Sequence, residues 1–280
     1  MNLHSEIVEV VRHALAEDIG TGDVTSELTI PAGRQAEGRF FARDEIVVCG
    51  TNLLPLIFQL RGGIDRLDIY KHNGDAASDG EALAYVRGDA RRLLECERVA
   101  LNFLQRLSGI ATKARGYVNA VAGTKTKVLD TRKTTPGLRR LEKMAAAAGG
   151  VTNHRMGLFD AVLIKNNHIA AAGSVTAALQ TAMPEAARRG LPLEIEVRTW
   201  EELNEALACG APKLLLDNLT PAEARQWIEH VAGRASCEIS GGITLETIRP
   251  YAEAGADFVS CGAITHSATA VDLNFRVNLL

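Results

Sequence analysis

The sequence has no excess of positive charge, no paired-cysteine motif and no long apolar segment near its N-terminus. Its formal net charge is −3, so nothing draws the whole molecule to nucleic acid or to an acidic membrane. The five cysteines lack CxxC or zinc-type spacing, which suits buried thiols in a reducing compartment. Residues 1–20 carry acids and no continuous apolar stretch, so we expect no signal peptide, no membrane span and a cytoplasmic enzyme.

The second half of the chain has a regular rhythm of short apolar segments, each running into a polar or charged residue. Roughly 20–35 residues of mostly helical composition separate them, which is typical of repeated βα units around a parallel sheet. In such barrels the active site forms at the C-terminal ends of the strands. The six segments are Val128–Asp130, Ala161–Lys165, Leu193–Glu196, Lys213–Asp217, Cys237–Ser240 and Phe258–Gly262.

The first half reads as a smaller α/β domain. From residue 30 to about 87 the pattern favours short strands and one helix, and 91–121 is a long helical region with an expected break at Ser108–Gly109. We therefore predict an N-terminal α/β domain with its helical linker over 1–121 and an α/β barrel over 122–266. The apolar tail, 267–280, is expected to pack back on the N-terminal domain.

Two polar loops follow the first barrel strands. Arg132 and Lys133 stand among hydroxyl residues before Pro136-Gly137 and could form an anion cradle. A glycine pair, Gly149-Gly150, precedes His154 and Arg155, and glycines permit the close backbone approach that a ligand requires.

Three charged residues mark the next strand ends. Lys165 must reach an anion, form a Schiff base or pair with an acid, for which Glu196 or Asp217 is available; His168 is expected only to hydrogen-bond its loop. Glu194 and Glu196 share one strand face, so either could line the barrel. Asp217 could hold Mg²⁺ or sugar hydroxyls, because Thr220-Pro221 suits the cap of the next helix better.

Glycine loops end the last two strands. Ser240-Gly241-Gly242 follows the fifth and Gly262 the sixth. Late glycine loops that lead into a helix form the phosphate site of many barrels.

These motifs, taken with others along almost the whole chain, resemble quinolinate phosphoribosyltransferase. The resemblance implies a type II phosphoribosyltransferase fold, with an α/β N-terminal domain followed by an open, incomplete α/β barrel of about seven strands. It also implies dimers, or assemblies of dimers, whose sites are completed by the partner chain. The matching segments are 17–26 (EDIGTGDVTS), 97–112, 130–139 (DTRKTTPGLR), 153–169, 194–197 (EIEV), 214–218 (LLLDN), 240–244 (SGGIT) and 261–267 (CGAITHS).

The resemblance assigns roles to the charged residues. It implies a cationic pocket for two anionic substrates, phosphoribosyl pyrophosphate and quinolinate, with Lys165 as the candidate for stabilising or protonating the decarboxylated ring. Glu196 and Asp217 would hold the ribose hydroxyls and, directly or indirectly, Mg²⁺; no organic cofactor is needed. The pocket would comprise Arg132, Lys133, His154, Arg155 and Lys165, with Arg98 from the partner subunit, and Ser240, Gly241, Gly242 and Gly262 would take the 5′-phosphate.

The sequence departs from the family pattern at three positions beside this pocket. The family usually has an aromatic at Met144, a third glycine at Val151 and an acid at Asn166. The departures remove no catalytic group but affect fine geometry.

Two other functions compete with phosphoribosyl transfer. A Schiff-base barrel lyase would use Lys165 but leave the arginines without a purpose. A paralogue that merely binds an anion would not need every charged position of the motif set.

Overall fold

The computed structural model describes residues 4–280, so residues 1–3 of the predicted N-terminal domain lie outside the described range. The chain divides into two units. One comprises residues up to 115 with 134–150 and 267–280, and the other comprises 116–133 and 151–266. The sequence predicted domain limits at residues 121 and 266 instead, which placed residues 134–150 in the barrel.

The segment 134–150 belongs with the first unit because its helix packs closely on the long helix of that unit. Helix α5 (Arg139–Ala148) ends at Gly149, where a Cβ would lie 2.4 Å from the carbonyl oxygen of Ala111 in α4 (Ala90–Ala120). Gly149 therefore serves helix packing, whereas the expectation that the Gly149-Gly150 pair makes room for a ligand stays a prediction.

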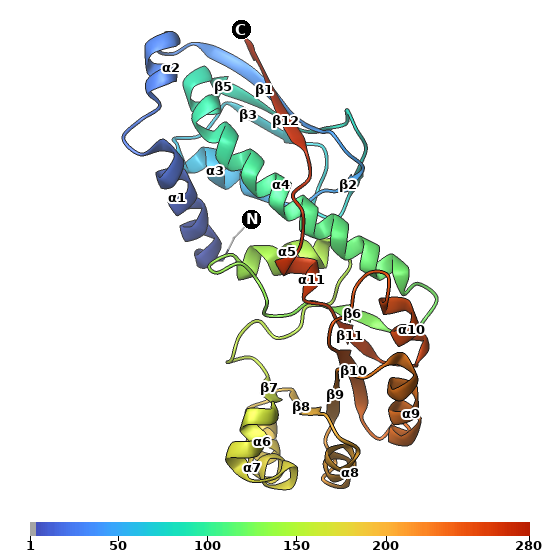
Figure 1. The fold of residues 1–280 in the computed structure, drawn as a ribbon. Helices are drawn as coiled ribbons and strands as arrows, with labels where there is room; N and C mark the ends of the chain where they lie inside the picture. The colour runs from blue at the N-terminus through green and yellow to red at the C-terminus, as the bar shows by residue number, and fades with distance from the viewer. Residues whose placement is uncertain (1–3) are drawn as a thin grey trace. The chain divides into compact units, whose positions relative to one another are not determined.

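A four-stranded antiparallel sheet in the order β12-β1-β5-β3 organises the first unit (Figure 1). Alternate residues of β1 are buried, as expected of a strand with one face on a core. Its strands are β1 (Gln35–Ala42), β3 (Arg66–Ile69), β5 (Ala82–Asp89) and β12 (Leu273–Leu279), with β2 (Ile46–Val47) and β4 (Ala76–Ala77) paired separately. The remaining helices of this unit are α1 (Ser5–Ile19), α2 (Val24–Thr29), η1 (Thr51–Leu53) and α3 (Leu54–Leu60).

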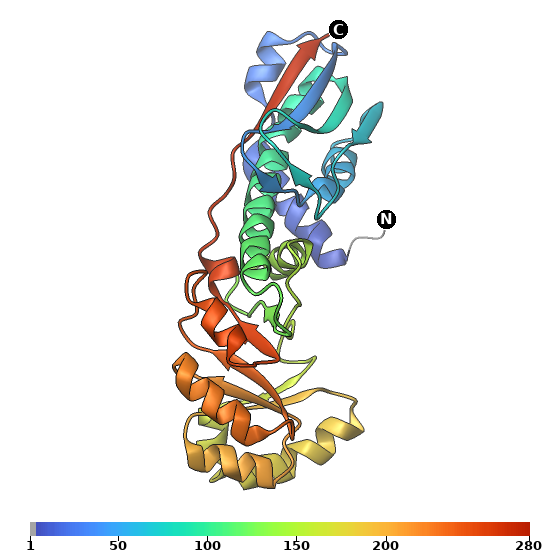
Figure 2. The ribbon, with the colours of Figure 1, turned by 90° about the vertical axis from the view of Figure 1, so that its right-hand side faces the viewer.

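The C-terminal tail forms part of this sheet. Strand β12 pairs antiparallel with β1, beside which it lies in both ribbon views (Figures 1 and 2). The rings of Phe40 and Phe275 lie 4.4 Å apart between the two strands. A Cβ on Gly38 would meet the Phe275 ring at 2.2 Å, so glycine at this position makes room for the tail.

Helix α4 is continuous, so the expected break at Ser108–Gly109 is wrong. Glycine is required at 109 for a different reason: a Cβ there would lie 2.1 Å from the carbonyl oxygen of Thr269. The tail runs against the helix backbone at this point, and only a residue without a side chain allows that approach.

A parallel sheet forms the second unit, and all six predicted strands are present in it. The order is β6-β11-β10-β9-β8-β7. Strands β7 to β11 are therefore neighbours in the order of the chain, and β6 pairs with β11. A single parallel bridge between Leu129 and Thr152 extends the β6 edge. Because β6 and β7 stand at opposite ends of this order, the barrel is open, as expected. Its strands are β6 (Lys127–Leu129), β7 (Val162–Ile164), β8 (Leu193–Val197), β9 (Lys213–Asp217), β10 (Ser236–Ser240) and β11 (Phe258–Ser260).

Helices connect the strands and cover the outer face of the sheet. The outward residues of β8, Leu193, Ile195 and Val197, belong to one apolar cluster with α7, α8 and α9. Glu194 and Glu196 consequently face inward, as the alternation predicts. The helices are α6 (Asn166–Ala172), α7 (Val175–Arg188), α8 (Trp200–Ala208), α9 (Pro221–Val231), α10 (Ile248–Glu253) and α11 (Ala263–His266). No helix within residues 4–280 has both the length and the apolar composition needed to cross a bilayer.

We predict that Gly109→Ala lowers the free energy of unfolding by about 1–3 kcal/mol, the usual cost of overpacking. The new methyl group would push against the backbone at Thr269. Gly116→Ala, in the same helix, is the matched control, because its Cβ would meet only side-chain atoms of Leu245 at 3.8 Å. The control should be neutral or slightly stabilising, since alanine favours helix. Equal unfolding midpoints in urea for the two variants would contradict the prediction.

Candidate active site at the carboxyl edge of the barrel

A carboxylate held between two cations lies at the ends of β7 and β8. Glu196 is 3% exposed, and its Oε2 lies 3.0 Å from Nζ of Lys165. Its Oε1 lies 2.7 Å from Nη2 of Arg198, although that oxygen accepts no hydrogen bond of good geometry. Of the three fates considered for Lys165, the structure shows the pairing with Glu196.

Asp217 stands next to this group at the end of β9. Its Oδ2 accepts a hydrogen bond from the Asn218 side chain at 2.8 Å and lies 3.5 Å from Arg198. Burial and the negative charge of Glu196 raise the pKa of Asp217, while Arg198 and Lys165 oppose the rise. Asp217 does not cap the next helix. That helix, α9, is capped by Thr220 with Pro221 in its first turn, as predicted.

The glycine loops lie beside these acids. Gly241 has φ of +113°, and a Cβ on it would lie 2.3 Å from Oδ1 of Asn218, so glycine is needed for the two loops to meet. Gly242 has φ of +58° and nothing within 4 Å of a Cβ, which leaves open space above the loop. A Cβ on Gly262 would lie 2.8 Å from the Lys133 side chain, so the structure brings these two predicted residues together.

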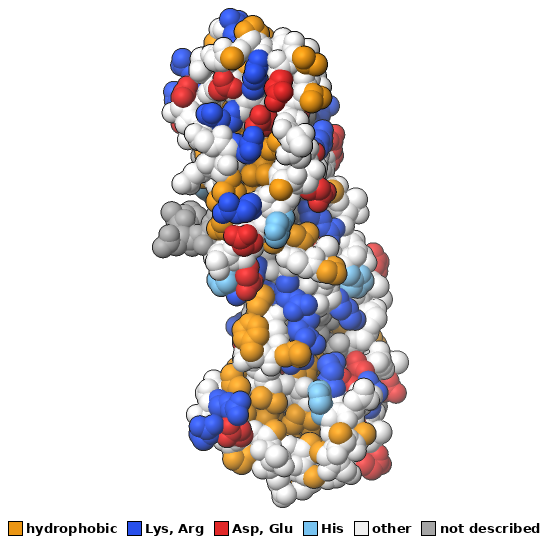
Figure 3. Space-filling model, turned by 90° about the vertical axis from the view of Figure 1, so that its left-hand side faces the viewer, with side chains coloured by type: hydrophobic (Ala, Val, Ile, Leu, Met, Phe, Trp, Pro, Cys, Tyr) orange, Lys and Arg blue, Asp and Glu red, His pale blue; other side chains and the backbone are white. Residues whose placement is uncertain are grey.

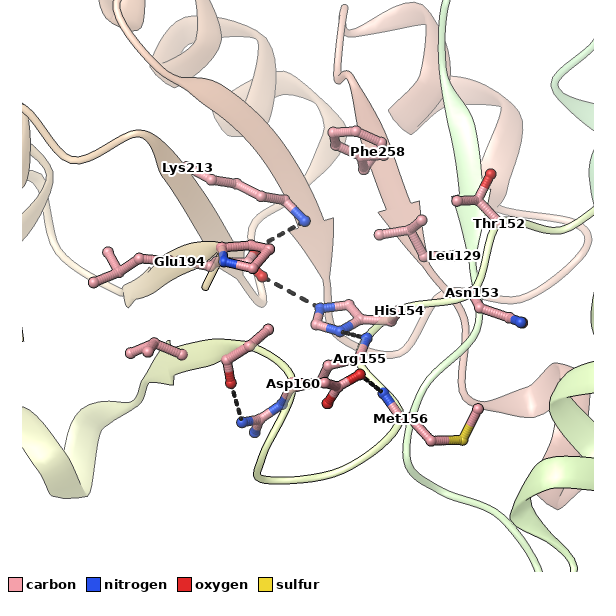
Figure 4. A pocket seen from close by; sticks show the side chains of 14 residues that line it. Leu129, Thr152, Asn153, His154, Arg155, Met156, Asp160, Glu194, Lys213 and Phe258 are labelled. Carbon is pink, nitrogen blue, oxygen red and sulfur yellow. Dashed lines mark hydrogen bonds and ion pairs between the residues drawn. The ribbon is translucent and has the colours of Figure 1, made fainter. Parts of the chain in front are cut away.

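His154 and Arg155 line a cavity of about 440 Å³ in the barrel (Figure 4). Asp130, fully buried, accepts the backbone N–H of His154 at 2.8 Å. Nδ1 of His154 accepts the backbone N–H of Arg155 at 2.7 Å, and Nε2 lies 3.2 Å from Oε2 of Glu194. Burial and the neighbouring Arg132 lower the pKa of Arg155, which places the two guanidinium groups in each other's field.

Glu194, Lys213 and Glu238 form a charge cluster next to His154, in which the two carboxylates are buried and Lys213 is 24% exposed. Nζ of Lys213 lies 2.6 Å from Oε2 of Glu238 and 3.4 Å from Oε1 of Glu194. His154, Glu194 and Glu238 have the spacing of a metal site, but the Lys213 ammonium already supplies a cation there.

Two of the groups that could bind a metal are well suited to Mg²⁺. Glu196 and Asp217 offer carboxylate oxygens, the ligand type that this hard cation prefers. Glu196 Oε1 is buried and lies 2.7 Å from Arg198 Nη2, but it accepts no hydrogen bond of good geometry. A divalent cation bound here would give this oxygen a partner.

Comparison with known proteins covers the whole chain. The model of the quinolinate phosphoribosyl transferase N-terminal domain matches residues 23–108, and that of the C-terminal domain matches residues 110–276. The chain belongs to the quinolinate phosphoribosyltransferase family.

Relatives and solved structures agree with this placement. The probable nicotinate-nucleotide pyrophosphorylase [carboxylating] of Bacillus subtilis is 40% identical over 99% of this chain and 95% of its own. The Mycobacterium leprae nicotinate-nucleotide pyrophosphorylase [carboxylating] is also 40% identical, over 95% of both chains. The solved nicotinate-nucleotide pyrophosphorylase of Francisella tularensis superposes with a TM-score of 0.92 at 35% identity, covering 99% of this chain and 98% of its own.

The structure separates the predicted site residues into three sets. Arg98 lies exposed on α4 in the first unit. The others lie in the second unit, either at the carboxyl edge of the sheet or around the cavity. The carboxyl-edge set is Lys133, Lys165, Glu196, Asp217, Ser240, Gly241, Gly242 and Gly262, and the cavity set is His154 and Arg155 with Arg132 near them.

Sequence reasoning missed Arg198, Lys213 and Glu238. Strand alternation contained a signal for two of them, because Lys213 shares a face with Asp217 on β9 and Glu238 shares one with Ser240 on β10. Arg198 follows the end of β8 and carried no such signal. The hydrogen bond expected between His168 and its loop is present: its Nδ1 accepts the backbone N–H of Lys165 at 2.9 Å.

The three departures from the family pattern lie in different surroundings. Met144 Sδ lies 3.6 Å from the side-chain amide of Asn52, and Val151 is 4% exposed. Asn166 is an exposed residue at the start of α6.

We predict that Asp217→Asn stabilises the protein at pH 7. The raised pKa means that ionised Asp217 disfavours the folded state, and the amide removes that charge. The gain should stay below about 1 kcal/mol, since solvent screens a partly exposed carboxylate. It should be complete above the raised pKa and disappear as the pH falls below 3.8, the ordinary value.

Thermal unfolding across this pH range checks the prediction. Asp79→Asn is the control, because its side chain is 68% exposed and the change should be neutral at every pH. A midpoint for Asp217→Asn below that of the wild type at pH 7 would show that the carboxylate stabilises the fold.

Proposed function

We propose that this protein transfers the phosphoribosyl group of phosphoribosyl pyrophosphate to quinolinate and releases the 2-carboxylate as CO₂. The products are nicotinate mononucleotide, pyrophosphate and CO₂, a step of de novo NAD biosynthesis. The observation that carries this proposal is the cluster of Lys165, Glu196, Arg198 and Asp217 at the carboxyl edge of an open barrel in a chain matched along its length by this family.

Cations bind the two polyanionic substrates in this proposal. The molecule has a net charge of −3, yet Lys and Arg side chains gather on the face drawn in Figure 3. Arg132, Arg155 and Lys165 bind the carboxylates of quinolinate, with Arg98 supplied by the partner of a homodimer. His154 lines the same pocket, with both ring nitrogens turned to protein groups.

The sugar phosphate occupies the other half of the carboxyl edge. Ser240, Gly241, Gly242 and Gly262 bind the 5′-phosphate through open loops, supported by the space above Gly242 and by Lys133 alongside Gly262. Glu196 and Asp217 orient the ribose hydroxyls and hold Mg²⁺, which, when bound, stabilises the charge on the departing pyrophosphate. No organic cofactor enters the reaction.

The chemistry follows from the positions of these groups. The ring nitrogen attacks the anomeric carbon as pyrophosphate leaves, through an oxocarbenium-like state that Glu196 and Asp217 help to orient. Ribosylation makes the ring nitrogen cationic, and that charge stabilises the carbanion left at C2 when CO₂ departs. Lys165 protonates or stabilises this carbanion.

The setting of the enzyme follows from the same features. We propose a cytoplasmic homodimer, or an assembly of dimers, that acts without nucleic acid or membrane. The five free cysteines, four of them buried, fit a reducing compartment. In the part of the site that the structure describes, Lys165 pairs with Glu196, and the relatives named above bear neither a lyase nor a binding-protein name. These observations favour neither the Schiff-base lyase nor the anion-binding paralogue.

The direct test is product formation. Purified protein mixed with quinolinate, phosphoribosyl pyrophosphate and Mg²⁺ should yield nicotinate mononucleotide and equimolar CO₂. Omission of either substrate should abolish both products. A protein that binds quinolinate without turnover would favour the anion-binding paralogue, and trapping of a carbonyl substrate on Lys165 by borohydride would favour the lyase.

We predict that nicotinate does not replace quinolinate. Losing one carboxylate leaves a cation of the pocket unpaired, which costs about 2–5 kcal/mol. The value of kcat/KM should therefore be at least about 30-fold lower for nicotinate. Comparable values for the two acids would mean that the pocket does not recognise the 2-carboxylate.

We predict that Lys165→Ala lowers kcat by about 100-fold or more and leaves the fold intact. The side chain is 45% exposed at a strand end, so its charge serves the reacting ring more than the core. Lys125→Ala, which removes an exposed lysine paired with Asp257 in the same unit, should keep wild-type turnover. Near-normal kcat in the Lys165 variant would remove the role given to this residue.

We predict that Arg98 acts in trans. Arg98→Ala and Lys165→Ala should each be inactive, but a mixed dimer would contain one site lacking both groups and one intact site. Mixing the variants after mild dissociation should restore up to about half of wild-type activity per mixed dimer, by the symmetry of a two-fold interface. Size-exclusion chromatography of tagged subunits verifies the exchange. Exchange without recovered activity would show that Arg98 does not complete the partner's site.

A further inference from the structure

Three charged side chains lie together on neighbouring strands inside the barrel, two of them buried carboxylates and the third a lysine that is 24% exposed. Glu194 on β8 and Glu238 on β10 are 4% and 0% exposed, and Lys213 on β9 reaches both of them. The Lys213 ammonium also lies 4.6 Å from the centre of the Phe258 ring, a cation–π contact. Figure 4 shows Lys213 and His154 both directed at the carboxylate of Glu194.

Packing alone does not account for this cluster. Barrel interiors are usually filled by branched apolar side chains, and replacing buried ion pairs by such residues is often neutral or stabilising. Here two carboxylates share one ammonium, and Oε1 of Glu238 is buried without a hydrogen-bond partner. Because this charge cluster is expected to reduce the stability of the fold, we look for its role in ligand binding or catalysis.

The cluster connects to the pocket through His154. Nε2 of His154 lies 3.2 Å from Glu194 Oε2 and 3.6 Å from Glu238 Oε2. Its Nδ1 accepts the backbone N–H of Arg155, and this hydrogen bond requires the proton of the neutral ring to sit on Nε2, facing the carboxylates. The ring therefore links the carboxylates of Glu194 and Glu238 to the main chain of Arg155.

We propose that Lys213, Glu194 and Glu238 are positioning residues for quinolinate binding. Lys213 holds the two carboxylates, the carboxylates hold the His154 ring, and the ring holds the backbone of Arg155, whose guanidinium binds the substrate. This inference rests on the proposed function, which supplies the ligand of Arg155. In this proposal the three residues act through His154 and not on the substrate itself, although Glu194 and Lys213 also line the cavity.

The arrangement predicts an effect on one substrate only. Removing Lys213 leaves two buried carboxylates to repel each other and to pull the His154 ring out of place. Arg155 then loses its position, while the carboxyl-edge loops that bind the sugar phosphate keep theirs. Binding of quinolinate should weaken and binding of phosphoribosyl pyrophosphate should not.

The test is steady-state kinetics of the full-length enzyme with four variants. Lys213→Met should raise KM for quinolinate at least 10-fold and change KM for phosphoribosyl pyrophosphate less than 2-fold. Lys213→Met/Glu238→Gln should recover most of the loss, because one ammonium and one carboxylate charge are removed together. Glu238→Gln completes the double-mutant cycle, and Lys125→Met, on an exposed ion pair, is the control that should match wild type.

Direct binding separates positioning from loss of fold. Calorimetric titration with quinolinate should show the same 10-fold weakening for Lys213→Met, and circular dichroism reports its folded fraction. If Lys213→Met does not fold, Lys213→Arg, which keeps the cation, and Glu238→Gln, which keeps the side-chain volume, replace it in the test. Each should show a smaller increase in KM that is again selective for quinolinate.

Three outcomes decide the matter. A selective change in quinolinate KM that the double variant reverses supports the proposal. Unchanged KM in a folded variant, or equal changes for both substrates, would overturn it while the proposed function stands. Wild-type protein that neither binds nor converts quinolinate would overturn the proposed function and this inference together.

Discussion

The alternation of side chains along the parallel strands is the constraint on which the site depends. Each strand must turn one face to the covering helices, and on β8 the residues Leu193, Ile195 and Val197 meet that need. The other face looks into the barrel. Barrel interiors are usually filled by branched apolar side chains, but here the inner face of β8 carries Glu194 and Glu196.

Charge compensation then determines how the inner face is arranged. Glu196 is flanked by Lys165 and Arg198, and Glu194 is flanked by Lys213 and His154. The first group lies at the carboxyl edge, where the proposed anionic substrates would compete with Glu196 for Lys165 and Arg198. The cations of the second group are less exposed, at 24% for Lys213 and 13% for His154 against 45% for both Lys165 and Arg198. In the proposed mechanism the same strand therefore supplies one carboxylate for chemistry and one for support.

Glycine residues set the close approaches that bring the parts of each unit together. Gly109 allows the tail to pack against α4, and Gly149 allows the end of α5 to pack against α4. Gly241 allows the loop after β10 to contact Asn218. Only the last of these lies in the candidate site. A glycine beside a functional motif is therefore as readily explained by packing as by a ligand, and coordinates are needed to tell the two apart.

The sequence alone was sufficient for the class of fold, the six barrel strands and the motif residues at their ends. Strand composition and strand alternation are local properties, and a parallel order places all carboxyl ends at one edge, so Lys165, Glu196 and Asp217 could be grouped without coordinates. The partner of Lys165 could be narrowed to two acids but not chosen, since the choice depends on which strand lies beside β7.

Tertiary structure alone decided which charges neutralise one another. Arg198, Lys213 and Glu238 are ordinary charged residues in the sequence, and they matter because β8, β9 and β10 are neighbours at a particular register. The sequence around Gly109 could not show that α4 continues through it, because the residue that requires a glycine there, Thr269, is far away in the chain. Local patterns determine what each segment can form, whereas burial and pairing across segments determine what each charged group can do.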